Sequence, residues 1–193
     1  MKTTFLLHGG RLRLHDERND SYFHELTRQL SDGDEVLFIG FARRDEADRI
    51  EVYEREKQFI LAQTKLDIKV INATHENLIN QIQSAKTIHI TGGETDELVK
   101  DMQKYPDFIA SIRGKVVGGS SAGACLFSTY YFFSTSNSVL KGLGTLPIRL
   151  LVHYGSTEFR ATDESLELLK AFPAQLELVA LEECAWIAKE IDI

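Results

Sequence analysis

The stretch Val116-Val117-Gly118-Gly119-Ser120-Ser121-Ala122-Gly123-Ala124 runs from a short apolar segment into a Gly-x-Ser-x-Gly motif. The apolar segment predicts a strand, and the residues after the motif permit a helix. A strand–turn–helix of this kind is typical of a nucleophile elbow, whose strained turn exposes one serine and requires small neighbours. We therefore predict Ser121 as a nucleophile and the Ala122 N–H as a donor to an oxyanion. The alternative is a Gly/Ser-rich turn with a purely structural role.

Strand-like and helix-like patterns alternate on both sides of this motif. Several of the strand-like segments are apolar throughout, as expected for parallel strands covered on two faces. The alternation predicts one α/β domain over residues 1–193, with a doubly wound, mostly parallel sheet and helices on both faces. The expected strands of its first part are Thr3–His8, Glu35–Phe41, Asp67–Ile71, Thr87–Thr91 and Lys115–Gly118.

The second half of the chain is harder to interpret. Residues 129–162 have a less regular pattern, and the aromatic run Tyr130–Phe133 fits either the core or the face of a homodimer. A helix is expected around Glu164–Ala171, followed by strands at Leu176–Leu181 and Ala185–Ala188. For the first helix of the chain, we expect Asp20 as the N-cap because an aspartate can accept a hydrogen bond from the first turn.

Composition and charge narrow the classes of function. The chain has 193 residues, a formal net charge of −7 and two cysteines. An acidic protein is a poor partner for nucleic acid or a membrane surface, since both present phosphate. Cys125 and Cys184 have neither metal-site nor disulfide-framework spacing, so we expect a protein whose cysteines are reduced. Acyl transfer through an activated serine needs no metal and no organic cofactor. With no signal-like or membrane-spanning segment, the expected location is cytoplasmic.

Doubly wound sheets bind ligands beyond the carboxyl ends of their strands. Glycine-bearing turns fall at three such ends: Gly9-Gly10, Gly92-Gly93 and Gly118-Gly119. A serine needs a base to take its proton, and His153 lies at the end of the apolar run Ile148–Val152. The other histidines are assigned to packing or to solvent-exposed segments. We therefore expect His153 to serve Ser121.

A third group should orient the imidazole of the base. No Asp or Glu occurs between Ser121 and His153, which excludes the order serine, acid, histidine of the α/β-hydrolases. Among the later acids, Glu182 and Glu183 lie in a tight turn between two apolar runs. The residues themselves leave the choice between these two open.

The chain resembles the aspartyl dipeptidase (peptidase E) and cyanophycinase family of serine peptidases, which have a class I glutamine amidotransferase-like fold. The resemblance covers most of the chain and rests on four segments in order. They are Ile90-Thr91-Gly92-Gly93-Glu94-Thr95, Gly119-Ser120-Ser121-Ala122-Gly123-Ala124, Gly142-Leu143-Gly144 through His153-Tyr154, and Leu181-Glu182-Glu183-Cys184-Ala185-Trp186-Ile187.

The resemblance implies Ser121 as the nucleophile, His153 as the base and Glu183 as the orienting acid. It also implies an oxyanion hole from the backbone N–H groups of Ala122 and Gly93. Four positions depart from the family pattern. Ser120 precedes the nucleophile, where the family often has a large residue or Thr, and Val152 replaces the Pro that usually precedes the histidine. Glu94 replaces the Asn of a Gly-Gly-Asn-Thr turn, and Cys184 replaces the Gly that usually follows the acid.

The implied reaction is hydrolysis of a small peptide, with a dipeptide carrying an N-terminal Asp as the preferred substrate. For substrate binding we expect Arg149 or Arg160 to take the carboxylate, Glu94 to take the ammonium group, and Tyr154 to lie beside them. Three alternatives stay open: cyanophycinase-like cleavage of an Asp/Arg polymer, a glutamine amidotransferase, and a non-catalytic binding protein. The amidotransferase is the weakest because its chemistry uses a cysteine at the elbow.

Overall fold

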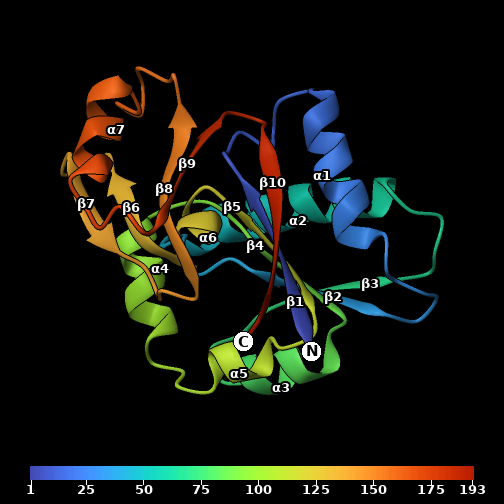
Figure 1. Ribbon diagram of the computed structural model, residues 1–193. Coiled ribbons are helices and arrows are strands. Elements are labelled where there is room, and N and C mark those ends of the chain that lie inside the picture. Colours follow the sequence, from blue (N-terminus) through green and yellow to red (C-terminus); the bar gives the residue numbers. More distant parts are fainter.

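The strand ahead of the Gly-x-Ser-x-Gly motif lies inside a six-stranded sheet (Figure 1). The computed structural model describes residues 1–193. Five strands of this sheet are parallel, and the strand at one edge is antiparallel. In spatial order they are β10 (Trp186–Asp192), β1 (Lys2–His8), β5 (Val116–Ser120), β4 (Thr87–Ile90), β2 (Glu35–Ile39) and β3 (Lys69–Asn72). The α/β class and the five expected strands of the first part of the chain are confirmed.

Side chains alternate between the two faces of this sheet, and each face is covered. Leu6, Val36 and Phe38 pack against two helices, α1 (Glu17–Thr27) and α2 (Glu46–Ala62). Phe5 and Leu7 belong to the larger core cluster on the other face. The helices contributing to that cluster are α3 (Leu78–Ser84), α4 (Thr95–Met102), α5 (Phe108–Ser111) and α6 (Ala122–Cys125). This arrangement is the doubly wound sheet predicted from apolar strands.

A second sheet forms largely from the region that we expected to be irregular, and its last strand, at residues 177–182, is one that we expected. Its strands, in spatial order, are β7 (Ser138–Lys141), β6 (Ser128–Phe133), β8 (Leu146–Tyr154) and β9 (Glu177–Glu182). Strands β6, β8 and β9 are parallel, and α7 (Asp163–Lys170) connects β8 to β9. The irregular reading of residues 129–162 was therefore wrong. Within the run Tyr130–Phe133, Tyr131 and Phe132 are buried in the protomer.

The expected cap of the first helix was also wrong. Helix α1 begins at Glu17, and the side chain of Asp16 accepts a hydrogen bond from the Arg18 N–H. An aspartate four residues earlier than expected therefore fills the N-cap position.

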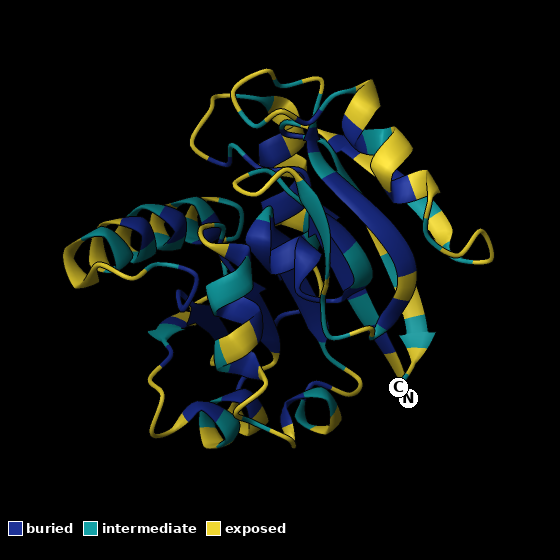
Figure 2. Cartoon of the chain, turned by 90° about the vertical axis from the view of Figure 1, so that its left-hand side faces the viewer, coloured by how far each residue is buried: buried dark blue, intermediate teal, exposed yellow.

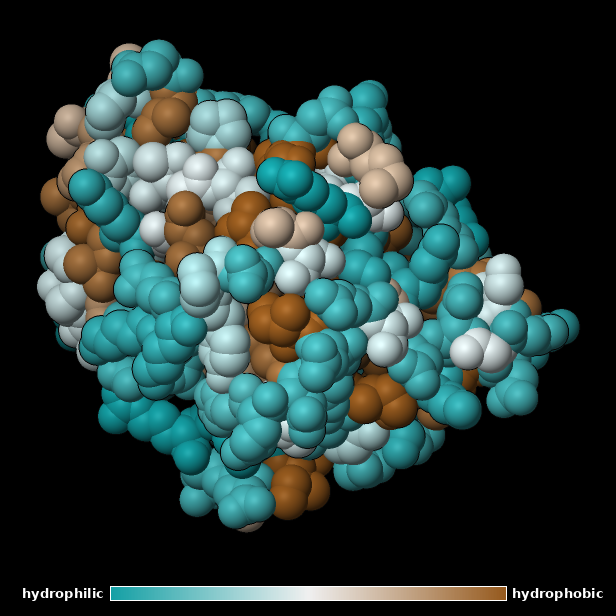
Figure 3. All heavy atoms as spheres, turned by 90° about the horizontal axis from the view of Figure 1, so that it is seen from below, coloured by the Kyte–Doolittle hydropathy of each residue, from teal (hydrophilic) through white to brown (hydrophobic).

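The core is concentrated in the strands of the larger sheet (Figure 2). On the face seen from below, hydrophilic side chains predominate and the apolar atoms form several separate patches (Figure 3). None of the helices has the length and apolar character needed to cross a membrane.

Candidate active site

Ser121 occupies a strained turn between β5 and α6. Its backbone has φ 50° and ψ −107°, a left-handed φ that is rare for a residue with a side chain. The Ser121 N–H donates to the His8 carbonyl oxygen, which ties the turn to the end of β1. A Cβ on Gly119 would lie 2.3 Å from the Gly123 carbonyl oxygen, so the neighbours must be small. These features match the elbow geometry expected from the sequence.

His153 reaches Ser121 from the second sheet. The distance from Ser121 Oγ to His153 Nε2 is 2.9 Å. A break in the pairing of β8 with β9 between Leu151 and Tyr154 accompanies a left-handed φ of 57° at His153. Bulges of this kind re-aim a side chain. The His153 N–H also donates to the Gly9 carbonyl oxygen at 3.0 Å, so this histidine is docked onto the turn that follows β1.

Glu183 completes a chain of hydrogen bonds from the turn after β9. Its Oε1 lies 3.3 Å from His153 Nδ1, while 69% of the Glu182 side chain is exposed. The next residue, Cys184, donates its N–H to the Gly10 carbonyl oxygen at 2.9 Å. Because the carboxylate can only accept, Nδ1 carries the proton and Nε2 is free to accept from the serine hydroxyl. Of the two acids left open by the sequence, Glu183 is the one beside His153.

The Gly9-Gly10 turn thus anchors both partners of Ser121, and Gly10 also lies under the imidazole. A Cβ on Gly10 would lie 2.1 Å from His153 Cε1 and 2.6 Å from Nε2, and the φ of Gly10 is +112°. The ring stacks on its other side against Phe159, with 3.9 Å between the ring centroids. The imidazole is therefore held between a backbone turn and an aromatic ring.

Arg11 contacts the same carboxylate and was not identified from the sequence. Its Nε donates to Glu183 Oε1 at 3.2 Å, and its Nη2 pairs with Glu158. Burial opposes ionisation of Glu183, but Arg11 and His153 outweigh it and lower the pKa of that carboxyl. The pKa of His153 is lowered by burial and by the Arg11 charge, although Glu183 acts in the opposite direction. Both shifts favour a neutral imidazole beside an ionised carboxylate. The only sequence signal for Arg11 was its position directly after a glycine turn at a strand end.

His8 supports the loop that carries Gly10 and Arg11. Its Nδ1 accepts from the Gly10 N–H at 3.0 Å, and its Nε2 lies 2.8 Å from the side-chain oxygen of Asn19. Asn19 in turn donates to the carbonyl oxygens of Arg11 and Leu14. Burial lowers the pKa of His8 to about 4, so the ring is neutral at pH 7. The packing role expected for His8 is therefore a hydrogen-bonded one.

The turn that follows β4 lies against Ser121. A Cβ on Gly92 would lie 3.1 Å from Ser121 Cβ, so the turn after β4 passes close to the serine. Strand β4 pairs with β5, as this meeting of the two turns requires. The N–H groups of Gly93 and Ala122 donate to no protein acceptor. At Gly93 a side chain is excluded, because a Cβ would lie 2.3 Å from the Ala42 carbonyl oxygen.

Two hollows share Ser121 and His153. One is a polar cleft of about 400 Å³ whose wall carries both arginine and acidic side chains. The other is a pocket of about 130 Å³ with an apolar part formed by Phe132, Phe133 and Val152. Glu94 lines both hollows, is exposed and makes no hydrogen bond through its side chain. The nucleophile candidate therefore lies where a charged and an apolar space meet.

The structure does not bring Arg149, Arg160 or Tyr154 to these hollows, which corrects three expected binding residues. Arg149 is buried, and its guanidinium donates to the carbonyl oxygens of Leu169, Phe172 and Leu176 near the end of α7. Such a cation suits a helix C-terminus. In a regular strand, Arg149 and His153 would lie on the same face because they are four residues apart. The irregularity between Leu151 and Tyr154 breaks this relation. Arg160 is exposed on the loop after β8, and the Tyr154 hydroxyl donates to Asp163.

Cys125 is not placed to act as a nucleophile. It is buried one turn beyond Ser121, and burial raises the pKa of its thiol. A thiol that stays protonated is a weak nucleophile. This position disfavours the amidotransferase alternative.

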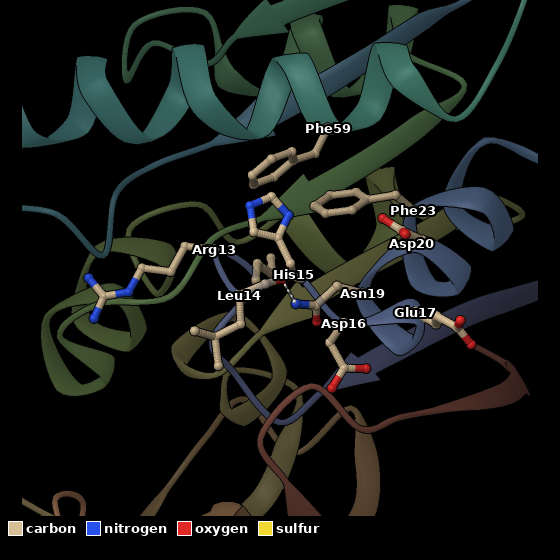
Figure 4. A pocket seen from close by; sticks show the side chains of 10 residues that line it. Arg13, Leu14, His15, Asp16, Glu17, Asn19, Asp20, Phe23 and Phe59 are labelled. Carbon is tan, nitrogen blue, oxygen red and sulfur yellow. Dashed lines mark hydrogen bonds between the residues drawn. The ribbon is translucent and has the colours of Figure 1, made fainter.

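A further hollow of about 280 Å³ lies beside the loop at 11–16 (Figure 4). There the imidazole of His15 lies beside Phe23 and Phe59, and Glu17 and Asp20 of α1 lie on one side of the hollow. Neither Ser121 nor His153 lines this hollow. The chemistry therefore belongs to the cleft and not to this space.

Comparisons with known proteins agree with this geometry. The model of peptidase family S51 matches residues 5–191. A protein from Listeria monocytogenes EGD-e assigned as a peptidase E has the same fold, with a TM-score of 0.70, 16% identity and 100% of both chains covered. A peptidase from an acI-B1 Actinobacterium aligns with a TM-score of 0.66 and 18% identity, over 98% of this chain and 84% of the other. At these identities the two structures establish the fold alone. None of the curated protein sequences is significantly similar to the chain.

Proposed function

This chain belongs to peptidase family S51 and is a serine-type peptidase, and from that premise we propose that it hydrolyses short peptides through a Ser121–His153–Glu183 triad. The observation that carries the proposal is the continuous chain of hydrogen bonds from Ser121 Oγ through the imidazole to Glu183, with distances of 2.9 and 3.3 Å. Hydroxyl, imidazole and carboxylate in this order are the groups that activate a serine.

In the proposed reaction, Ser121 Oγ attacks the peptide carbonyl carbon while His153 Nε2 takes the hydroxyl proton. The carbonyl oxygen becomes an oxyanion and accepts hydrogen bonds from the N–H groups of Gly93 and Ala122. Collapse of the tetrahedral intermediate breaks the C–N bond, and His153 gives its proton to the leaving amine. Water then attacks the acyl-enzyme with His153 again as the base, which releases the acid and restores Ser121.

Glu183 and Arg11 have supporting parts in this proposal. The carboxylate holds the Nδ1 proton and stabilises the imidazolium that forms in each step. Arg11 keeps Glu183 ionised and fixes its position through the shared Oε1. Their contribution is to hold His153 in one tautomer and one orientation.

For the substrate, we propose peptides with a free N-terminus, with dipeptides that begin with Asp as the preferred members. The cleft offers an acid, Glu94, for the ammonium group and arginines for a carboxylate. The apolar pocket beside Phe132 offers space for a group on the other side of the scissile bond. An oxyanion next to Glu94 would be destabilised by that carboxylate, and a bound ammonium group removes this penalty.

Hydrolysis of an aspartyl p-nitroanilide by the wild-type protein and by Ser121→Ala tests the proposal. We expect release of p-nitroaniline from the wild type only. Turnover that survives in Ser121→Ala would exclude Ser121 as the nucleophile. A third outcome is that neither protein acts on the aspartyl compound, while the wild type alone cleaves other aminoacyl p-nitroanilides. In that case the triad stands and the aspartyl preference is wrong.

A further inference from the structure

The cleft beside Ser121 contains one arginine on a helix whose guanidinium has no hydrogen bond to the protein. This residue is Arg55, on the side of α2 that faces the cleft. Its Nε is buried without a partner, and none of its nitrogens donates to a protein acceptor. A guanidinium N–H without an acceptor is unfavourable, so a ligand that supplies acceptors to this group is favoured.

Two of the other three arginines that line the cleft are already paired. Arg43 donates to the Gly92 carbonyl oxygen at 2.7 Å and to Asp48 at 3.2 Å. Arg11 is held by Glu183 and Glu158. Arg13 has no ion pair but is exposed on a loop, where water solvates it and binding must order a long side chain. Arg55 is therefore the arginine of the cleft that is partly buried, with a side chain 31% exposed, and still has donors without an acceptor.

Two glutamates lie close enough to the Arg55 guanidinium to attract its charge, but they accept no hydrogen bond from it. Nη2 lies 3.8 Å from Glu56 Oε1, and Nη1 lies 3.6 Å from Glu51, whose side chain is 77% exposed. Glu56 is buried, and its two oxygens already accept from Thr91 Oγ1 and pair with His89 Nε2, both at 2.9 Å. Glu56 thus orients the guanidinium by charge from below, while the N–H groups remain available to the cleft.

We propose that Arg55 is the specificity-determining residue that receives a carboxylate of the peptide substrate. A guanidinium presents two parallel N–H donors that match the two oxygens of a carboxylate. Two carboxylates of a dipeptide have this chemistry, the side chain of an acidic first residue and the C-terminus. The inference rests on the proposed function in one respect, which is that the ligand is a peptide substrate. Binding of the carboxylate by Arg55 does not require Ser121 to act as a nucleophile.

Calorimetric titration of the Ser121→Ala protein separates binding from turnover. The probes are Asp-Phe, its C-terminal amide, Asn-Phe, and the C-terminal amide of Asn-Phe. We expect one of the two carboxylates to strengthen binding about 10- to 100-fold, the usual range for a charged hydrogen-bonded pair. If amidation of the C-terminus removes the gain in affinity, the C-terminal carboxylate contacts the protein. If replacement of Asp by Asn removes it, the side-chain carboxylate does.

Adding Arg55→Gln to Ser121→Ala should remove that gain, so that acid and amide bind equally. Adding Arg55→Lys keeps a cation beside Glu56 but removes the two parallel N–H donors. This variant should retain only part of the gain in affinity. The matched control is Arg44→Gln, because Arg44 lies outside the cleft with a 68% exposed side chain paired to Glu97. This control should bind the four peptides as Ser121→Ala does.

The inference is overturned if Ser121→Ala binds all four peptides equally or none of them. It is also overturned if the gain in affinity persists in Arg55→Gln. Loss of the gain in Arg13→Gln would then identify Arg13 as the residue that binds the carboxylate. If Arg55→Gln has a lowered melting temperature, the Arg55→Lys protein decides, since it keeps the charge beside the buried Glu56. Failure of the proposed function would instead appear as turnover that survives Ser121→Ala.

Discussion

Replacing Gly10 by alanine should inactivate Ser121 by moving His153. The new Cβ would lie 2.1 Å from His153 Cε1, whereas ordinary contacts begin near 3.4 Å. The imidazole must therefore retreat by about 1.3 Å, and Phe159 stacks on its opposite face. A shift of this size removes the 2.9 Å hydrogen bond to Ser121 Oγ. Misplacing a reacting group by about 1 Å can cost about 100-fold in rate, so we expect at least that loss.

The assay is the second-order rate of labelling by a fluorophosphonate, which needs an activated serine but no knowledge of the peptide substrate. Gly33→Ala is the matched control, because Gly33 also has a left-handed φ, +87°, but a Cβ there meets nothing within 4 Å. Both variants should lose about 1–3 kcal/mol of stability from the strained φ. Only Gly10→Ala should lose labelling. A Gly10→Ala protein that is labelled within threefold of the wild-type rate would refute the account of how His153 is held.

Three further predictions concern the charged and buried groups around the site. In Arg11→Gln, loss of the cation that lowers the pKa of His153 should move the acidic limb of the labelling rate to higher pH. A limb that stays in place would show that the Arg11 charge does not act on His153. Arg149→Met should lower the free energy of unfolding by about 2–4 kcal/mol, because buried carbonyl oxygens lose their charged donor. Its labelling rate should not change, and a selective loss of activity would restore Arg149 as a binding residue. The pKa of His8 is lowered from 6.5 to about 4, so the folded state binds this proton more weakly than the unfolded state does. The free energy of unfolding should therefore decrease by about 2 kcal/mol when the pH is lowered from 7 to 5. In His8→Asn, urea unfolding at these two pH values should show a correspondingly smaller loss, and an unchanged loss would exclude His8 as its source.

The parts of the site that could be predicted are those with a local signature. Ser121 follows from a strand, a turn of small residues and a helix that are contiguous in the chain. His153 was expected as a base because it lies at the end of an apolar run, and the structure places it beside Ser121. From the residues alone the acid was narrowed only to Glu182 or Glu183. The choice depends on which side of a turn each carboxylate faces, and that is decided by packing.

The parts that were missed depend on contacts between distant segments. The second sheet arises because β6 and β7 pair as a hairpin and β8 inserts beside β6, a strand order that no sequence period encodes. Arg149 was taken for a binding residue because it lies near His153 in sequence. Its role at the end of α7 becomes visible only when α7 packs against the sheet. Arg11 was missed for the same reason, because 172 residues separate it from Glu183.

The central claim is that Ser121 is activated by His153 as a nucleophile. Intact-protein mass spectrometry after exposure to a fluorophosphonate, followed by peptide mapping, measures this directly. The account predicts a single adduct on Ser121 in the wild type, none in Ser121→Ala, and a rate reduced by at least about 100-fold in His153→Ala. An adduct on another residue, or labelling of Ser121 at an undiminished rate in His153→Ala, would contradict it.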